Sequence, residues 1–303
     1  MRNNSMWFDE RGRPIQAHGG WILPTDDGFF WYGEDKSCET RDRRVEAIGI
    51  RCYRSADLRS WHDCGLVLPT SPDHPCPLMR PSGVVERPRV VRCEATGRYV
   101  MWFHADDATY RAASIGVAMA SDPAGPFELV RAMRPNNQQS RDMTLFSEEQ
   151  GRIYVIYSSE SNWTLHIAAL TEDCLDVEGD FARVFIDQKR EAPCVFAAHD
   201  QRYLVTSGCS GWHPNAALFG TAVAMDGRWR LIDNPCRGPR EHTTFDGQIT
   251  CIFRAGDGYL ALIDHWCRED LGTSRYSLVA VRFTDDRHDP MEIVWSDEAA
   301  SIS

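Results

Sequence analysis

A short pattern occurs five times in this chain of 303 residues and constrains its fold more than any other feature. Each copy begins at a turn-forming position, usually Gly or Asp, and continues into aromatic and aliphatic residues that favour β-strands. The copies are Asp27–Tyr32 (DGFFWY), Gly97–Phe103 (GRYVMWF), Gly151–Tyr157 (GRIYVIY), Gln201–Thr206 (QRYLVT) and Asp257–Ile263 (DGYLALI). Their spacing of about 50 to 70 residues fits one four-stranded blade per copy. The sequence therefore predicts an all-β fold, a five-bladed β-propeller.

A second recurring element precedes each copy and carries polar residues. Its segments are Gln16–Leu23, Val85–Val91, Arg141–Phe146, Glu191–Phe196 and Phe245–Phe253, and the polar residues are His18, Glu86, Asp142, Glu191 and Gln248. The first strand of each propeller blade lines the central channel, so we expect these side chains to converge. Crowding like charges is costly, which favours a functional reason for three carboxylates at one point. The alternative is that they are ordinary polar residues at strand starts, facing solvent.

The phased repeats extend from residue 16 to residue 283 and leave no room for an independent second domain. We therefore predict a single domain, residues 1–303, with blades starting near 16, 85, 141, 191 and 245. A net charge of −11 argues against nucleic acid or an anionic membrane as a partner. No apolar run approaches the length of a membrane span.

The cysteine pattern indicates buried free thiols. The chain contains 11 cysteines, an odd number, and none has the C-x-x-C spacing of a zinc site or redox pair. We predict no cofactor, although His18 could ligate a metal ion at the axis; a lone His more often forms hydrogen bonds. The first 13 residues lack the apolar core of a secretory signal, so a cytoplasmic location is expected. The oligomeric state is left open.

Carboxylates that converge in a pocket suit glycoside cleavage, which needs a proton donor and a partner that activates water or attacks the sugar. Glu191 is the best candidate for the acid, and Pro193 is expected to hold Ala192 in an extended backbone. Glu86 has a similar setting and is followed by Arg87. That guanidinium either keeps a neighbouring carboxylate charged or forms a surface ion pair.

Tryptophans near the blade starts and inter-strand turns could stack on sugar rings, although core packing is their commoner role. The candidates are Trp21, Trp31, Trp163, Trp212 and Trp266, and the first two choices are Trp212 and Trp163. The motifs of other chemistries are absent: the chain has no G-x-S-x-G, phosphate loop or H-E-x-x-H.

Eight segments, in order, resemble glycoside hydrolase family 43, and within it the exo-β-1,3-galactanase branch. They are QAHGGWIL, FFWYGEDK, VVERPRVV, YVMWFHADDATY, SRDMTLF, REAPCVF, SGCSGWHPN and LGTSRY, and together they span about Ile15 to Phe283. The resemblance implies a five-bladed propeller that hydrolyses glycosides with inversion. It also implies the substrate, a β-1,3-linked galacto-oligosaccharide or galactan that loses its terminal galactose.

The resemblance also implies roles for the polar residues. Asp142 and Glu191 match the modulator and the acid of the family, whereas His18 lies where an Asp base is usual. The galactanase branch shares this gap, and there a Gln in blade five has been proposed as the base with help from a Glu in blade two. Gln248 and Glu86 occupy those positions, and which of them is the base stays open.

Further positions match residues that hold the terminal galactose in that branch, namely Glu34, Tyr110 and Asn162. With His18, Arg87 and Trp212 they complete the predicted substrate-binding set. Within the same family, an α-L-arabinofuranosidase or β-xylosidase is the alternative activity. The missing Asp in blade one also permits a sugar-binding propeller without catalysis.

Overall fold

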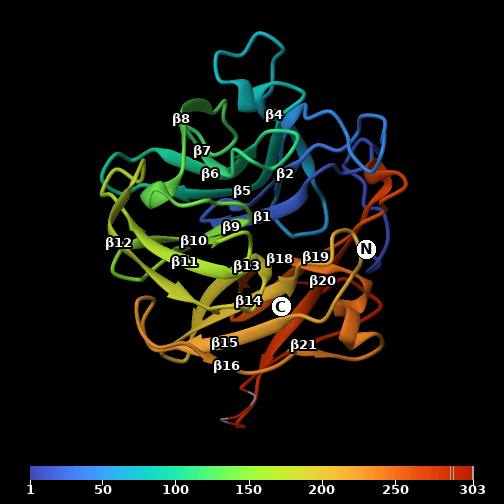
Figure 1. The fold of residues 1–303 in the computed structure, drawn as a ribbon. Helices are drawn as coiled ribbons and strands as arrows, with labels where there is room; N and C mark the ends of the chain where they lie inside the picture. The colour runs from blue at the N-terminus through green and yellow to red at the C-terminus, as the bar shows by residue number, and fades with distance from the viewer. Residues whose placement is uncertain (287, 289, 302–303) are drawn as a thin grey trace.

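Five β-sheets surround a common axis in the computed structural model, which describes residues 1–286, 288 and 290–301 (Figure 1). Blade one comprises β1 (His18–Thr25), β2 (Gly28–Glu34), β3 (Gly49–Ser55) and β4 (His62–Pro69). Blade two comprises β5 (Val84–Arg92), β6 (Tyr99–Asp106), β7 (Ser114–Ala120) and β8 (Glu128–Met133). Blade three comprises β9 (Met143–Ser147), β10 (Ile153–Ser159), β11 (Thr164–Leu170) and β12 (Val177–Val184).

The last two blades are less regular. Blade four comprises β13 (Arg190–Ala198), β14 (Gln201–Gly208), β15 (Leu218–Ala222) and β16 (Arg230–Leu231). Blade five comprises β18 (Gln248–Ala255), β19 (Gly258–His265), β20 (Arg275–Phe283) and β21 (Met291–Val294), and β17 (Cys236–Arg237) pairs in parallel with β21. Short 3-10 helices lie between strands: η1 (Pro77–Met79), η2 (Pro135–Asn137), η3 (Glu241–Asp246) and η4 (Leu271–Thr273).

The predicted repeats coincide with the first two strands of every blade. The strands β1, β5, β9, β13 and β18 lie around the centre of Figure 1, and each contacts its neighbour in the ring. The five copies of the aromatic pattern lie in the second strands. The prediction of a five-bladed propeller is therefore confirmed.

Apolar side chains fill the space between adjacent blades. The buried residues form five hydrophobic clusters, and each cluster lies between one pair of neighbouring blades. Because a blade buries both of its faces, its strands need apolar residues on both sides, as in the continuous run of β6. This packing explains why the second strands are the easiest elements to recognise in the sequence.

The N-terminal segment closes the ring against blade five. Isolated bridges join Arg2 to Glu298 and Ser5 to Tyr276. The side chain of Asn3 donates to the backbone oxygen of Ser296 at 2.9 Å and accepts from the backbone N–H of Leu278 at 2.8 Å. Hydrogen bonds between the two ends of the chain therefore hold blades one and five together.

A fully buried guanidinium, that of Arg89 in β5, fills the centre of the ring. It donates to the carbonyl oxygens of Gly19 at 2.9 Å, Pro88 at 2.8 Å and Thr250 at 2.9 Å, and to the hydroxyl of Thr144 at 3.2 Å. These partners belong to the inner strands of blades one, two, three and five. One side chain therefore joins four blades at the axis.

All eleven cysteines lie in described residues and are free thiols, and six of them are buried. Among the described residues, no helix is long and apolar enough to cross a membrane.

Candidate active site

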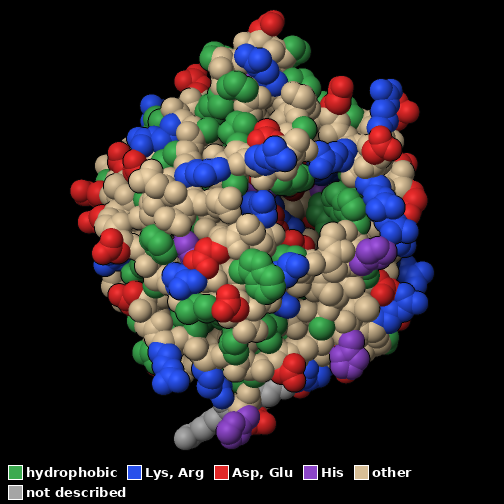
Figure 2. Space-filling view, viewed as in Figure 1, with side chains coloured by type: hydrophobic (Ala, Val, Ile, Leu, Met, Phe, Trp, Pro, Cys, Tyr) green, Lys and Arg blue, Asp and Glu red, His purple; other side chains and the backbone are tan. Residues whose placement is uncertain are grey.

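A pocket of about 560 Å³ opens where the inner strands begin, and every blade contributes to it. Glu34 comes from blade one, Glu86 from blade two, Asp142 from blade three, Glu191 from blade four and Gln248 from blade five. Figure 2 shows this face of the molecule hollowed near its centre, with acidic side chains inside the hollow and basic side chains near its rim. The predicted convergence of Glu86, Asp142, Glu191 and Gln248 is therefore seen in the structure.

β-Bulges direct two of the acidic side chains. The pairing register shifts directly after Glu86 in β5 and after Glu191 in β13. The residues that follow them, Arg87 and Ala192, have φ values of 53° and 49°. A bulge of this kind bends the strand and changes the direction of its side chains. The expectation that Pro193 keeps Ala192 extended is therefore wrong.

The bulges also expose backbone N–H groups, and each meets a carboxylate of the preceding blade. Gly19 N donates to Asp264 Oδ2 at 2.6 Å, Arg87 N to Glu34 Oε1 at 3.1 Å, and Ala192 N to Asp142 Oδ2 at 2.9 Å. These charge-assisted bonds hold the backbone in an otherwise unfavourable left-handed conformation. At Ala192, the hydrogen bond to Asp142 outweighs the preference for an extended backbone that the following proline imposes.

Glu191 has the properties of a proton donor. Burial and the nearby charge of Asp142 raise its pKa to about 7, and Arg87 opposes this rise. Gln248 Nε2 lies 3.4 Å from Glu191 Oε1. A carboxyl group with this pKa is still largely protonated at slightly acidic pH, as a general acid must be.

Arg87 forms a buried ion pair with Asp142, with 2.9 Å between Nε and Oδ2. The pair is buried, so it is not the surface ion pair that was one of the two roles considered for this guanidinium. Its Nη1 atom is buried without a hydrogen-bond partner. The residue itself lines the pocket.

Neighbouring groups fix the orientation of the Gln248 side chain. Its Oε1 accepts from Arg87 and, at 3.2 Å, from Trp266 Nε1, both of which only donate. Its Nε2 donates to Ser207 Oγ at 2.8 Å and also faces Glu191. The amide therefore has both of its polar atoms occupied by protein groups.

Glu86 has a different set of neighbours in the pocket. Its Oε1 is 3.5 Å from Lys36 Nζ and 3.3 Å from the hydroxyl of Tyr110. Lys36 also binds Glu34 Oε2 at 2.7 Å. Burial raises the pKa of Glu34, and the charge of Lys36 opposes the rise. Glu34 and Tyr110 both line the pocket, where they were predicted to bind substrate.

His18 does not reach the pocket. Its side chain is 0% exposed, stacks on Tyr276 at 5.0 Å and packs against the ring of Trp266 at 5.6 Å. Its prediction as a substrate-binding residue is therefore wrong, since a fully enclosed imidazole cannot contact a sugar. The bulge at Gly19, bonded to Asp264, places His18 behind the pocket wall.

The five candidate tryptophans have three different positions in the structure. Trp212 and Trp266 line the pocket and pack edge to face at 5.2 Å. Trp31 is fully buried in the core, and Trp21 packs against the core and donates to a backbone oxygen of β5. Trp163 is 47% exposed but does not line the pocket.

The remaining residues that line the pocket include one that was predicted and several that were not. Asn162 was predicted, lines the pocket, and donates to Cys209 Sγ at 3.7 Å. Arg141 and His104 were not predicted. The strand β6 carried a signal for His104, because His-x-Asp places two polar side chains on one face of an otherwise apolar strand. Among the described residues, no three His, Cys, Asp or Glu side chains are grouped as metal ligands would be.

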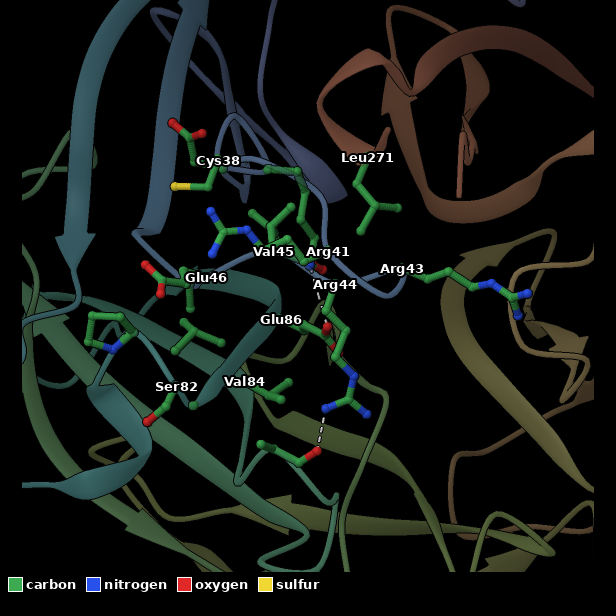
Figure 3. Close-up of a pocket in the computed structure, with 18 of the residues that line it drawn as sticks. Cys38, Arg41, Arg43, Arg44, Val45, Glu46, Ser82, Val84, Glu86 and Leu271 are labelled. Carbon is green, nitrogen blue, oxygen red and sulfur yellow. Dashed lines mark hydrogen bonds and ion pairs between the residues drawn. The ribbon is translucent and has the colours of Figure 1, made fainter. Parts of the chain in front are cut away.

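A side cavity of about 480 Å³ adjoins the pocket (Figure 3). Glu86, Tyr110 and Trp212 line both spaces. In Figure 3 the loop between β2 and β3 carries Arg41, Arg43 and Arg44 along one side of this cavity. The pocket therefore has additional room beside the acidic cluster.

Comparisons with known proteins agree with this geometry. A β-1,3-galactosidase of family 43, solved with galactodeoxynojirimycin, is 32% identical to this chain and superposes on it with a TM-score of 0.92. The match covers 98% of this chain and 99% of that protein. An exo-β-1,3-galactanase variant from Phanerochaete chrysosporium, solved with β-1,3-galactotriose, is 29% identical with a TM-score of 0.90, over 98% of this chain and 67% of that one. An exo-β-1,3-galactanase from Clostridium thermocellum is 29% identical with a TM-score of 0.87, over 100% and 68% of the two chains.

A search of curated proteins found no match. The family model described as glycosyl hydrolases family 43 matches residues 25–236. This match and the structural likeness confirm the resemblance inferred from the sequence motifs. The chain belongs to glycosyl hydrolase family 43 and is a glycosidase.

Proposed function

We propose that this enzyme removes terminal galactose from β-1,3-linked galacto-oligosaccharides or galactan, with inversion at the anomeric carbon. The observation that carries the proposal is Glu191, a half-buried carboxyl group with a pKa raised to about 7 that shares one pocket with Glu86 and Asp142. The substrate follows from the relatives, because a β-1,3-galactosidase overlaps almost the whole of this chain.

In the proposed reaction, Glu191 donates its proton to the glycosidic oxygen as the bond to the anomeric carbon breaks. Water attacks that carbon from the opposite face and gives its proton to a base, so the product has the inverted configuration. Asp142 supports Glu191 in two ways: its charge raises the pKa of the acid, and it binds the N–H of Ala192, the next residue. Proton exchange with solvent then restores both groups.

Glu86 is the stronger candidate for the base. Both polar atoms of the Gln248 side chain already bind protein groups, and a neutral amide is a poor base. Gln248 is also only 3.4 Å from Glu191, whereas acid and base in an inverting glycosidase are about 6.5–9.5 Å apart. We assign Gln248 to holding Arg87 and Glu191 in place.

Azide provides a test of this assignment. Glu86→Ala should lower kcat roughly a hundredfold, and azide should restore turnover by replacing the activated water. The product should be α-galactosyl azide, identified by NMR, because azide enters on the face that water uses. Gln248→Ala is the matched comparison. If azide rescues Gln248→Ala and not Glu86→Ala, Gln248 is the base.

The substrate is tested with β-1,3-galactotriose. Galactose should be released from the chain end, and its first-formed anomer in the NMR spectrum should be α. Aryl α-L-arabinofuranoside and aryl β-xyloside, tested in parallel, should be poor substrates. Faster cleavage of either would replace the proposed substrate. Binding of galactotriose without new reducing ends would instead indicate a sugar-binding protein.

Trp212 is expected to contribute to sugar binding because its ring lines the pocket. Trp212→Ala should raise KM for galactotriose about fivefold, since a stacking contact is worth on the order of 1 kcal/mol, while kcat changes little. Trp163→Ala is the control, because that ring is exposed but lies outside the pocket. Equal effects of the two substitutions on KM would contradict the assignment.

A further inference from the structure

His104 stands at the floor of the pocket as half of a buried His–Asp pair. It lies in β6 directly opposite Glu86 of β5, and its side chain is 1% exposed. Its Nε2 lies 3.0 Å from Asp106 Oδ2. The other oxygen of Asp106 accepts the backbone N–H groups of Asp107 and Ala113, both at 2.9 Å. Asp106 is therefore fixed in position and orients the imidazole.

The second ring nitrogen faces two pocket carboxylates. His104 Nδ1 lies 3.7 Å from Glu86 Oε2 and 4.0 Å from Asp142 Oδ1. It is buried and has no hydrogen-bond partner. A protonated ring would place an N–H between these two carboxylates, whereas a neutral ring with its proton on Nε2 would turn a lone pair toward them.

The other surroundings of the ring favour the charged form. On β7, the opposing residue is the apolar Ile115. The ring of Tyr110 packs at 5.8 Å. Two cations contact the carboxylates themselves: Lys36 contacts Glu86, and Arg87 contacts Asp142. The pocket is also lined by Arg43, Arg44 and Arg141. Burial lowers the pKa of His104, but Asp106 and the two pocket carboxylates outweigh burial and raise it above its usual value.

We propose that His104, anchored by Asp106, is a positioning residue of the reaction: its imidazolium is a third buried cation, beside Lys36 and Arg87, that stabilises the charged forms of Glu86 and Asp142. The inference rests on the proposed function, in which Glu86 activates water and Asp142 supports the acid. The imidazolium gives the pocket a cation that faces Glu86 and Asp142 from the side of β6, beside Glu191, the carboxyl group whose pKa is raised to about 7.

The charge of His104 is measured directly by NMR titration of the wild-type imidazole nitrogens, with the signal assigned from His104→Gln. We expect a pKa above the ordinary value of about 6.5, and a lower pKa in Asp106→Asn because the anchoring charge is removed. A pKa of 6.5 or less in the wild type would overturn the inference. This measurement needs no turnover, so it remains decisive if the proposed substrate or base is wrong.

The effect on catalysis is read from the pH profile of kcat/KM. His104→Gln should move the acidic limb to higher pH by about 1 unit or more, because Glu86 and Asp142 lose a cation that favours their charged forms. His166→Gln is the matched control, a buried histidine of β11 that pairs with Glu160 instead. It should leave the acidic limb in place. An unmoved limb in folded His104→Gln would overturn the inference, and if that variant does not fold, Asp106→Asn decides by the same shift.

Discussion

Glu191→Gln is expected to lower kcat on galactotriose by about 10²–10⁴-fold, the contribution of a general acid. The substituted amide keeps the shape of the side chain but cannot donate a proton of comparable acidity. The loss should nearly disappear on an aryl galactoside with a good leaving group, because that group departs without protonation. Glu148→Gln is the control, since it makes the same chemical change in a carboxylate that pairs with Arg202.

The pH dependence should identify the same group. Because the acid acts in its protonated form and its pKa is about 7, kcat/KM of the wild type should fall as the pH rises through about 7. Asp142→Asn removes a charge that raises this pKa, so the alkaline limb should move to lower pH. Near-normal activity of Glu191→Gln on galactotriose, or an unmoved limb in Asp142→Asn, would contradict the assignment of Glu191 as the acid.

The second large effect concerns stability. Arg89→Met should lower the free energy of unfolding by about 3–5 kcal/mol, because it leaves several buried carbonyl oxygens at the axis without donors. Burial lowers the pKa of Arg89 to about 10, so the guanidinium is still charged at neutral pH. Arg89→Lys should be intermediate, since an ammonium group keeps the charge but cannot span acceptors from four blades.

Urea denaturation followed by tryptophan fluorescence measures the difference in unfolding free energy. Arg92→Met is the matched control, because Arg92 ends the same strand, is exposed, and lies 3.9 Å from Glu94 in a surface pair. Such pairs contribute little to stability. An unchanged unfolding midpoint in Arg89→Met would show that the axis is held by the apolar clusters between blades alone.

The fold was predictable because the strands of every blade are buried in the same way and therefore need the same kinds of residue. The second strand of each blade is buried on both faces, so it is rich in aromatic and branched residues, and a turn must precede it. The convergence of Glu86, Asp142, Glu191 and Gln248 followed from the same symmetry, because corresponding positions of successive blades meet at the axis. His104 escaped prediction because it lies in a second strand, outside that repeated position.

The direction of individual side chains could not be read in the same way. His18 occupies the repeated position, yet the bulge and its bond to Asp264 turn it behind the pocket wall. Ala192 precedes a proline, yet Asp142 of the neighbouring blade holds it at a positive φ. Arg89 resembles an ordinary charged residue of a strand, yet it fills the axis.

The sequence by itself determined the number of blades, the inner strands and the identity of the acidic residues that meet. These properties depend on the local pattern of apolar and polar residues, and that pattern recurs in every blade. Only the tertiary structure decided which of those residues enter the pocket, which carboxyl group has a raised pKa, and which side chain faces both Glu86 and Asp142. Those properties depend on contacts between different blades, and the energy of a buried charge is set by neighbours that are distant along the chain.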